Sequence, residues 1–374
     1  MLDAATLPLY LGGFLGPFGT AVVISIYPEL RDSFGASTQA VNWAFSGYMI
    51  PLAVLLTVSG TIGERFGRRR VTRFTFVIYA LASLLCVVAP NLGVFLTARV
   101  LQGAANAFIT PLLIAGLSET IAPGRLGRSI GVYSSFQAAG GALAPFAGGL
   151  AAAVDWRWAF VAVAAVALAL ATRPPAGEPR PAASAPPIRP LLTRRMATLW
   201  VGGFAAAAGP VGLAVVVGLH LRDELSAGST ATGVVLLLGG VGAAALGPTW
   251  GRLLDRWGAG RASMVSLVAL VALAAPLGLI TSSAAFAVAW MVVAAVIGFV
   301  VVNLQHLAAV AVPDNRGGAL SSVLAFRFMG HAVGPVMWVP LFDRSPAWTF
   351  AAAASLGVVT LAAFAAFVAA TPAE

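Results

Sequence analysis

Two arginines lie deep inside long apolar runs of the sequence. Arg99 lies seven residues beyond Leu92, where its run begins, and Arg327 lies eleven residues into another run. A charged side chain at the centre of a bilayer costs at least ~2.5 kcal/mol on insertion scales. Each guanidinium therefore needs polar partners or a water-filled cavity. A guanidinium can also bind a carboxylate or phosphate through two parallel hydrogen bonds, so the chemistry these residues indicate is ligand binding or ion coupling.

Other polar side chains lie inside the same apolar runs. Gln102 and Asn106 follow Arg99 at helical spacing, and His331 follows Arg327 by one helical turn. Amide, imidazole and aromatic side chains at similar depth complete a set of candidate substrate-binding or coupling residues. The set is Arg99, Gln102, Asn106, Gln137, Arg327, His331, Asn303, His306, Trp43 and Tyr133.

Acidic residues are missing from the middle of these runs. All 13 Asp and Glu residues fall in loops or at the ends of the runs. Without a carboxylate at that depth, neutral or anionic amphiphiles are favoured over cations as ligands. The sequence has one cysteine, and it contains no metal cluster, nucleotide-binding loop or nucleophile motif, so we expect no enzyme activity, no cofactor and no metal.

The composition places these residues in a membrane. Of the 374 residues, 59% are hydrophobic and 9% are charged, and the mean hydropathy is +0.92. Soluble domains carry about 25% charged residues. The net charge of +9 comes from arginines in short loops between apolar runs, which indicates the lipid surface as their partner and excludes nucleic acid.

The apolar runs predict the fold class. A membrane helix needs about 20 mostly apolar residues, and their abundant Gly and Ala favour close-packed helices over a β-barrel. We therefore expect an all-α membrane protein with twelve transmembrane helices. They lie near residues 5–28, 39–62, 71–90, 92–121, 128–153, 156–173, 196–221, 229–252, 261–281, 284–312, 316–340 and 346–369.

The distribution of arginine predicts the orientation. If the N-terminus lies inside, the inner loops hold sixteen arginines and the outer loops hold four. Positively charged loops stay in the cytoplasm. We expect a multi-pass protein of the bacterial cytoplasmic membrane with both termini in the cytoplasm.

The segment 174–195 divides the chain. It holds seven prolines between Pro174 and Pro190, and such a composition is typical of an extended linker. We expect an N-terminal six-helix half over 1–173, a cytoplasmic linker over 174–195 and a C-terminal six-helix half over 196–374.

The two halves share an internal repeat. Residues 60–67 match residues 251–258 at an offset of 191, and residues 140–145 match residues 330–335 at an offset of 190. Parallel repeats of this kind are typical of transporters with a central site between the halves.

The first of these motifs resembles a family signature. Gly60, Glu64, Arg65 and Gly67, followed by basic residues from Arg68, resemble the signature between the second and third helices of the major facilitator superfamily. The resemblance implies that this loop latches the two halves in the outward-facing state. Carried over by position, Glu64 would meet the N-terminal end of the eleventh span, and Arg68 would meet Glu119. The latch residues implied are Gly60, Glu64, Arg65, Gly67, Arg68, Glu119, Asp255 and Arg256.

Two further motifs narrow the resemblance. The segment 96–103, which contains Arg99, is similar to a signature of proton-driven members, and the segment 140–149 is similar to one associated with exporters. Residues 155–160 follow it as in drug:proton antiporters. A proline kinks a helix and small residues permit close contact. The hinge residues implied are Gly140, Pro145, Gly148, Gly149 and Pro335.

The resemblance implies a monomeric transporter that exports amphipathic small molecules in exchange for protons. Its halves would rock about a central cavity. An alternative is a carrier for a specific anionic metabolite or lipid, with Arg99 and Arg327 as anion ligands. A receptor-like protein that transports nothing is less favoured.

Overall fold

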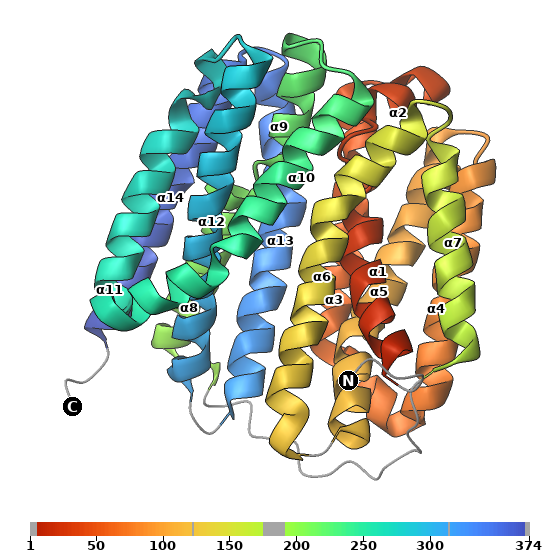
Figure 1. Cartoon of the computed structure of the whole chain (residues 1–374), viewed down its shortest axis with the longest axis horizontal. Coiled ribbons are helices and arrows are strands. Elements are labelled where there is room, and N and C mark those ends of the chain that lie inside the picture. The colour runs from red at the N-terminus through yellow and green to blue at the C-terminus, as the bar shows by residue number, and fades with distance from the viewer. Residues whose placement is uncertain (1–5, 122, 175–190, 313–314, 371–374) are drawn as a thin grey trace. The chain divides into compact units, whose positions relative to one another are not determined.

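The computed structural model describes residues 6–121, 123–174, 191–312 and 315–370 (Figure 1). The described part consists of helices, and eight of them are long and apolar enough to cross a membrane. The all-α membrane fold predicted from the sequence is confirmed. Most of the predicted linker 174–195 lies outside the described residues.

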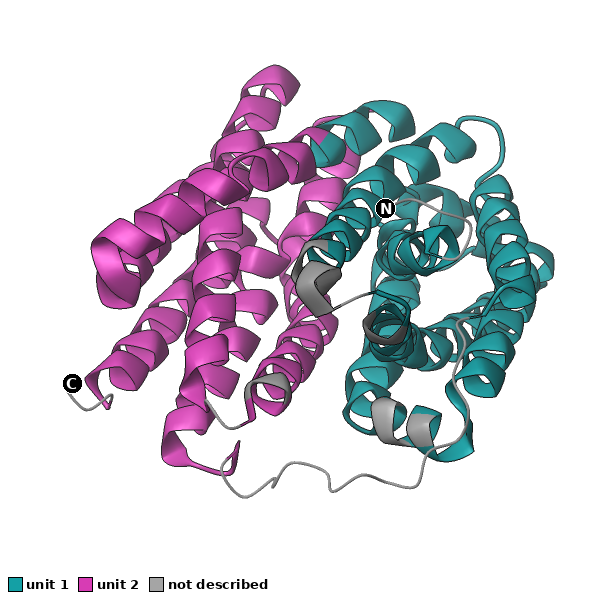
Figure 2. Ribbon diagram, turned by 60° about the horizontal axis from the view of Figure 1, so that its bottom comes forward, with its two compact units in different colours: residues 1–184, 228–237 teal, residues 185–227, 238–374 magenta. Residues whose placement is uncertain are grey.

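Contacts divide the chain into two compact units (Figure 2). Unit 1 comprises residues 1–184 and 228–237, and unit 2 comprises residues 185–227 and 238–374. The helices of unit 1 are α1 (Leu7–Ala21), α2 (Tyr27–Phe34), α3 (Thr38–Phe66), α4 (Arg68–Val88), α5 (Leu92–Thr120), α6 (Pro123–Ala152) and α7 (Arg157–Thr172).

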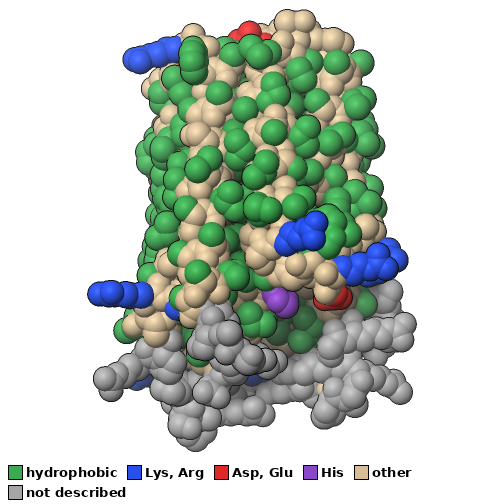
Figure 3. Space-filling model, turned by 90° about the vertical axis from the view of Figure 1, so that its left-hand side faces the viewer, with side chains coloured by type: hydrophobic (Ala, Val, Ile, Leu, Met, Phe, Trp, Pro, Cys, Tyr) green, Lys and Arg blue, Asp and Glu red, His purple; other side chains and the backbone are tan. Residues whose placement is uncertain are grey.

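Unit 2 begins with α8 (Arg194–Ala208) and α9 (Ala214–Leu219). The helix α10 (Ser229–Ala245) is divided between the units, and its first half packs on α6. The remaining helices are α11 (Gly247–Ala274), α12 (Ser283–Ala311), α13 (Arg316–Phe342) and α14 (Pro346–Ala369). On the face drawn in Figure 3, hydrophobic side chains cover most of the surface, and the few charged side chains lie at its top edge and in its lower half.

Three predicted spans differ from continuous helices. The first ends at Ala21 instead of reaching residue 28, and the separate helix α2 follows it. The seventh breaks at Gly209, where Pro210 lacks the N–H that would continue the helix. The eighth is divided at Leu246 between α10 and α11.

The repeated motif has the same backbone geometry in both units. Gly67 joins α3 to α4 with φ of 86°, and Gly258 interrupts α11 with φ of 71°. A side chain at such an angle would clash with the following carbonyl oxygen, so glycine is required at both turns. The two glycines occupy equivalent places in the repeat, at the offset of 191.

The repeat extends to helix packing. A Cβ atom added to Gly140 of α6 would overlap the carbonyl oxygen of Phe14 in α1. In unit 2, a Cβ atom on Gly330 of α13 would overlap the carbonyl oxygen of Phe204 in α8. Both members of the second pair lie 190 residues after those of the first. The small residues therefore set how closely each pair of helices approaches.

The other predicted hinge residues lie at the same kind of contact. Pro145 is inside α6 and Pro335 is inside α13. The Pro145 carbonyl accepts a hydrogen bond of 2.7 Å from the Ser25 hydroxyl. Gly148 lies against Val22, and Gly149 lies against the first turn of α10. Pro145, Gly148 and Gly149 thus contact neighbouring helices, and the action of all these residues as hinges stays a prediction.

Candidate functional site

Arg99 is fully buried among the helices of unit 1. Its Nε donates to the Ala44 carbonyl oxygen at 2.8 Å, and its terminal nitrogens donate to the carbonyls of Gly19 at 2.9 Å and Thr20 at 3.3 Å. It also donates to Gln102 Oε1 at 2.6 Å, and its guanidinium lies 4.4 Å from the centre of the Tyr48 ring.

The end of α1 explains this arrangement. The last four carbonyls of a helix have no donor within the helix. Because α1 ends at Ala21, the carbonyls of Gly19 and Thr20 are left for the Arg99 guanidinium. The helix dipole also favours a cation at this end. Arg99 thus has the polar partners that its burial requires inside unit 1, and its role in binding or coupling stays a prediction.

A chain of hydrogen bonds leads from Arg99 across unit 1. The Gln102 amide donates to Ser83 Oγ at 2.7 Å, and that hydroxyl donates to the Tyr79 carbonyl oxygen at 2.7 Å. The hydroxyls of Tyr79 and Tyr48 lie 3.0 Å apart. Gln102 therefore belongs with Arg99, as predicted from spacing. Tyr79 and Ser83 were missed, although two polar groups four residues apart in an apolar run are a signal for a shared helix face.

A second group of polar side chains lies where α1, α5 and α6 meet. Asn106 and Thr110 stand on α5, and Tyr133 and Gln137 stand on α6. The Gln137 amide donates to Thr110 Oγ1 at 3.1 Å. We call these four residues, together with Tyr10 of α1, the polar cluster. It unites three of the predicted site residues, Asn106, Tyr133 and Gln137.

Glycines on α1 bring the polar cluster together. A Cβ atom on Gly13 would overlap the Tyr133 ring, and one on Gly16 would overlap Asn106 Oδ1. Gly13 and Gly16 are three residues apart and so lie on one helix face. The two side chains therefore rest against α1 about one turn apart.

Several atoms of the polar cluster are buried without a hydrogen-bond partner. Among the described residues, the Tyr10 hydroxyl, Asn106 Oδ1 and the Tyr133 hydroxyl are buried and make no hydrogen bond of ordinary geometry. The Tyr133 hydroxyl faces Thr110, and the Asn106 side chain faces the Tyr48 hydroxyl. A buried polar group without a partner costs about 1–3 kcal/mol. Most such groups in proteins are satisfied by a neighbour, by water or by a ligand, so this cluster is a candidate binding site.

In unit 2, Arg327 and His331 lie on α13, as the spacing predicted. Within the described part of the chain, Arg327 Nε is buried without a hydrogen-bond partner, and the guanidinium lies 5.8 Å from the Phe328 ring centre. A Cβ atom on Gly212 would come within 3.3 Å of His331 Nδ1. Within the described part of the chain, the Arg327 guanidinium thus has fewer hydrogen-bond partners than the Arg99 guanidinium.

Three predicted site residues lie away from these groups. Trp43 of α3 is 43% exposed, and His306 of α12 is exposed. Asn303 is buried, and its amide donates to Ser263 Oγ at 2.6 Å, which joins α12 to α11. Among the described residues its Oδ1 is buried without a hydrogen-bond partner, and a role for Asn303 in binding or coupling stays a prediction.

The predicted latch is described only in part. Arg65, Asp255 and Arg256 are exposed, whereas Arg68 is 4% exposed. The side chains of Glu64 and Glu119 lie outside those the structure describes, as does the environment of Gly60. The contact between Arg68 and Glu119 and the contact of Glu64 with the eleventh span therefore stay predictions.

The motif at residues 155–160 closes one end of unit 1. The Trp156 indole donates to Ser33 Oγ at 2.9 Å, and Arg157 Nε donates to the Val87 carbonyl oxygen at 3.1 Å. The rings of Phe95, Trp156 and Phe160 pack edge to face. Among the described residues, no three His, Cys, Asp or Glu side chains group closely enough to hold a metal ion.

Solved structures share this arrangement of helices. The chain superposes on a bacterial homolog of the human lysosomal transporter Spinster, in an inward-facing and occupied conformation, with a TM-score of 0.78 at 16% identity, covering 98% of each chain. It superposes on a mutant of the nucleoside transporter NupG with a TM-score of 0.79 at 13% identity, covering 97% of this chain and 99% of that one. Structural similarity at such low sequence identity shows a shared fold and nothing more.

Curated relatives match a shorter stretch. A multidrug resistance protein B homolog of Mycobacterium tuberculosis is 37% identical over 157 residues, which is 40% of this chain and 28% of the relative. The puromycin resistance protein pur8 of Streptomyces alboniger is 35% identical over 152 residues, 40% of this chain and 30% of the relative. The match thus spans less than a third of each relative's length.

A family model covers nearly all of the chain. The Major Facilitator Superfamily model matches residues 9–212 and again residues 199–374, so each match contains one of the two copies of the internal repeat. Together with the duplicated glycine turns and the shared fold, these matches show that the chain is a multi-pass membrane protein of the Major Facilitator Superfamily.

Proposed function

We propose that this protein exports amphipathic small molecules across the cytoplasmic membrane by alternating access, in exchange for protons. The observation that carries the proposal is the polar cluster of α1, α5 and α6, where three buried polar atoms make no hydrogen bond of ordinary geometry to any described residue. The names of the relatives, a multidrug resistance protein and a puromycin resistance protein, support drug-like substrates.

The surroundings of the polar cluster suit a ligand with both apolar and polar parts. The rings of Tyr10 and Phe136 stack with centres 5.6 Å apart, and those of Phe14 and Phe18 stack nearby on α1 at 5.3 Å. Small-molecule sites combine apolar walls with a few well-placed polar groups. A neutral amphiphile that hydrogen-bonds to Asn106 and Tyr133 fits this description.

The charge of the interior favours neutral or anionic substrates. Among the described side chains, the buried charged ones include Arg68 and Arg99, and no Asp or Glu is buried. A cation would find no carboxylate partner there, and an unpaired charge in a low-dielectric site is costly.

The test is flux into proteoliposomes under an imposed pH gradient, with neutral, anionic and cationic amphiphiles of one scaffold. Tyr133→Phe removes only a hydroxyl and should lower the affinity for the neutral substrate by about 5- to 10-fold, the value of one hydrogen bond in a buried site. The control is Ser355→Ala, which removes an exposed hydroxyl bonded to its own helix. A transport rate that does not depend on the pH gradient would refute proton exchange. An unchanged substrate affinity in Tyr133→Phe would show that the polar cluster does not bind the substrate.

A second candidate function is a carrier for an anionic metabolite or lipid. Among the described residues Arg327 Nε has no hydrogen-bond partner, which favours this function, and we assign the anion to Arg327 in preference to Arg99 because Arg99 already makes four hydrogen bonds. Arg327→Lys should then raise the KM of anionic substrates alone, because a point charge does not replace the planar fork. Equal effects on neutral and anionic substrates would contradict this alternative.

We also infer that both termini face the cytoplasm of a bacterium and that the protein is monomeric. The orientation rests on the arginine distribution, and the monomeric state rests on the resemblance to the family. Single cysteines at positions 3 and 372, introduced after Cys86→Ser, should react with a membrane-permeant maleimide and not with an impermeant one in intact cells.

A further inference from the structure

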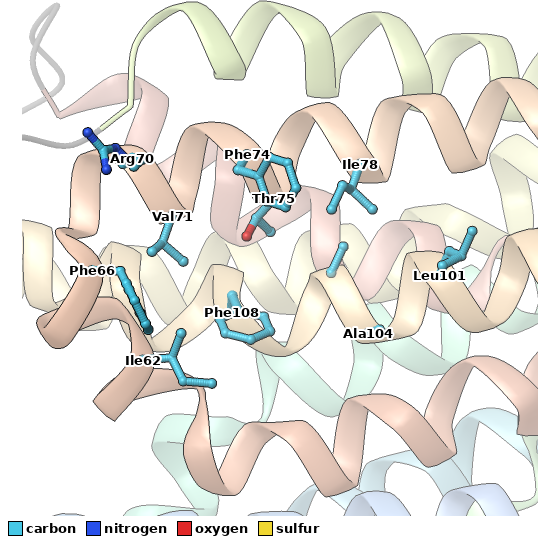
Figure 4. A pocket seen from close by; sticks show the side chains of 11 residues that line it. Ile62, Phe66, Arg70, Val71, Phe74, Thr75, Ile78, Leu101, Ala104 and Phe108 are labelled. Carbon is cyan, nitrogen blue, oxygen red and sulfur yellow. The ribbon is translucent and has the colours of Figure 1, made fainter.

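An elongated groove runs along the outside of unit 1 between α3, α4 and α5. It encloses about 440 Å³, within the ~300–1,000 Å³ range of small-molecule sites. Its floor on α5 is formed by small side chains, among them Ala104 and Ala105, and the bulky rings of Phe66 and Phe74 rise at its sides (Figure 4). It is separate from the polar cluster.

Periodicity explains the shape of the groove. Leu101, Ala104, Ala105 and Phe108 form one face of α5, and residues 70, 71, 74, 75 and 78 form one face of α4. The lining of α4 from Val71 to Ile78 extends about 11 Å along the helix at ~1.5 Å per residue. The groove therefore follows the helix axes, which is the direction of an acyl chain in a bilayer.

The groove is apolar along its length and cationic at one end. Phe66 is 55% exposed, Phe74 is 65% exposed and Leu101 is 42% exposed. Arg70 lies at one end of the groove, and Leu101 and Ile78 lie toward the other (Figure 4). An apolar chain with an anionic head is the ligand that complements this arrangement.

The sequence of α4 adds an independent reason for an anion at that end. Four of its first six residues are arginine, its first turn has no acidic residue, and Gly67 provides no capping side chain. Cations at a helix N-terminus are unfavourable because that end carries partial positive charge. Arg69, Arg70 and Arg73 are exposed, and an external anion would relieve their mutual repulsion.

We propose that this groove binds an anionic phospholipid, with one acyl chain between Phe66 and Phe74 and the phosphate at Arg70. Basic clusters next to membrane helices attract anionic lipids by ~1 kcal/mol per residue. This proposal concerns lipid binding alone and does not depend on which substrate the protein transports.

The experiment uses the full-length protein in nanodiscs and a phosphatidylglycerol that carries a photoreactive diazirine on its acyl chain. Attachment sites are mapped by peptide mass spectrometry, and a phosphatidylcholine with the same chain is the comparison. Labelling of residues 101–108 should be saturable with phosphatidylglycerol and at least fivefold weaker with phosphatidylcholine.

Two variants test the two parts of the site. Arg70→Gln should weaken labelling by phosphatidylglycerol about fivefold, the factor that corresponds to one arginine. Ala104→Phe should abolish it by filling the floor. The control for charge is Arg194→Gln, which removes an exposed arginine beside a groove of similar volume between α8 and α14. The control for bulk is Ala165→Phe, which adds a ring on the exposed face of α7.

Equal labelling by the two lipids would overturn the proposal, because it would show contact with bulk lipid only. Labelling unchanged in Arg70→Gln, or reduced equally in Arg194→Gln, would also overturn it. If Ala104→Phe does not fold, the Arg70→Gln comparison still decides the result, since Arg70 is exposed.

Discussion

Replacing Arg99 with methionine should destabilise the protein strongly. The change leaves the carbonyls of Gly19 and Thr20 without a donor, and Gln102 Oε1 loses its bond of 2.6 Å. The carbonyl of Ala44 keeps its donor within α3. Each newly unsatisfied buried group costs about 1–3 kcal/mol. Removing the buried charge offsets part of this, so the free energy of unfolding should fall by about 3–5 kcal/mol.

The assay is thermal unfolding of purified protein in detergent, followed by size-exclusion chromatography of the soluble fraction. Arg99→Lys should fall between wild type and Arg99→Met, because a single ammonium retains the charge but does not span the same acceptors. Arg252→Gln is the matched control, since Arg252 is exposed and bonds only its own helix. Its effect should stay within about 0.5 kcal/mol.

One result would refute the structural role of Arg99. If Arg99→Met and Arg99→Lys unfold like the wild type yet transport nothing, the hydrogen bonds to α1 contribute no stability. Arg99 would then act on the substrate or the proton.

Two further predictions concern the repeated glycines. Gly140→Ala should destabilise the protein by about 1–3 kcal/mol, because the added Cβ overlaps α1. Gly141→Ala should be neutral, because its Cβ would make an ordinary contact of 3.7 Å. Equal melting temperatures for the two variants would contradict the close helix contact. Gly258→Ala should cost about 1–3 kcal/mol because of its backbone conformation alone, with φ of 71° and ψ of 160°, since the space around it and around Gly251 is open. A Gly251→Ala variant measured by the same unfolding assay should lie close to wild type, and a Gly258→Ala variant equally stable would show that the turn tolerates a side chain.

The fold could be predicted from the sequence because hydropathy records which segments can lie in lipid. The breaks between Val88 and Leu92 and between Leu279 and Ser283 were predicted from short polar turns, and they are present. The division at Leu246 was not predicted, because residues 233–248 carry no polar side chain, although Gly247 and Pro248 lie directly after the break. Hydropathy measures burial in lipid and is insensitive to where a helix bends.

The site was predicted in part, for a related reason. Spacing on one helix placed Gln102 beside Arg99, and this contact is present. The other partners of Arg99 are main-chain carbonyls, which carry no signal in residue type. They become available because α1 ends at Ala21, and its apolar pattern continues beyond that residue. The polar cluster combines three helices, and single-sequence periodicity relates positions within one helix only.

The burial of Arg99 has a consequence for the order of membrane insertion. Three of its four acceptors lie on α1 and α3, the fourth is Gln102 of α5 itself, and the Ser83 that accepts from Gln102 lies on α4. All three helices precede α5 in the chain, so they leave the ribosome first. When α5 enters the membrane, the carbonyl groups that accept hydrogen bonds from its guanidinium are already there, and these hydrogen bonds reduce the cost of inserting a charged helix. A permuted chain that begins with α5 would present the same charge to bare lipid, and it should insert poorly even though its final contacts are identical.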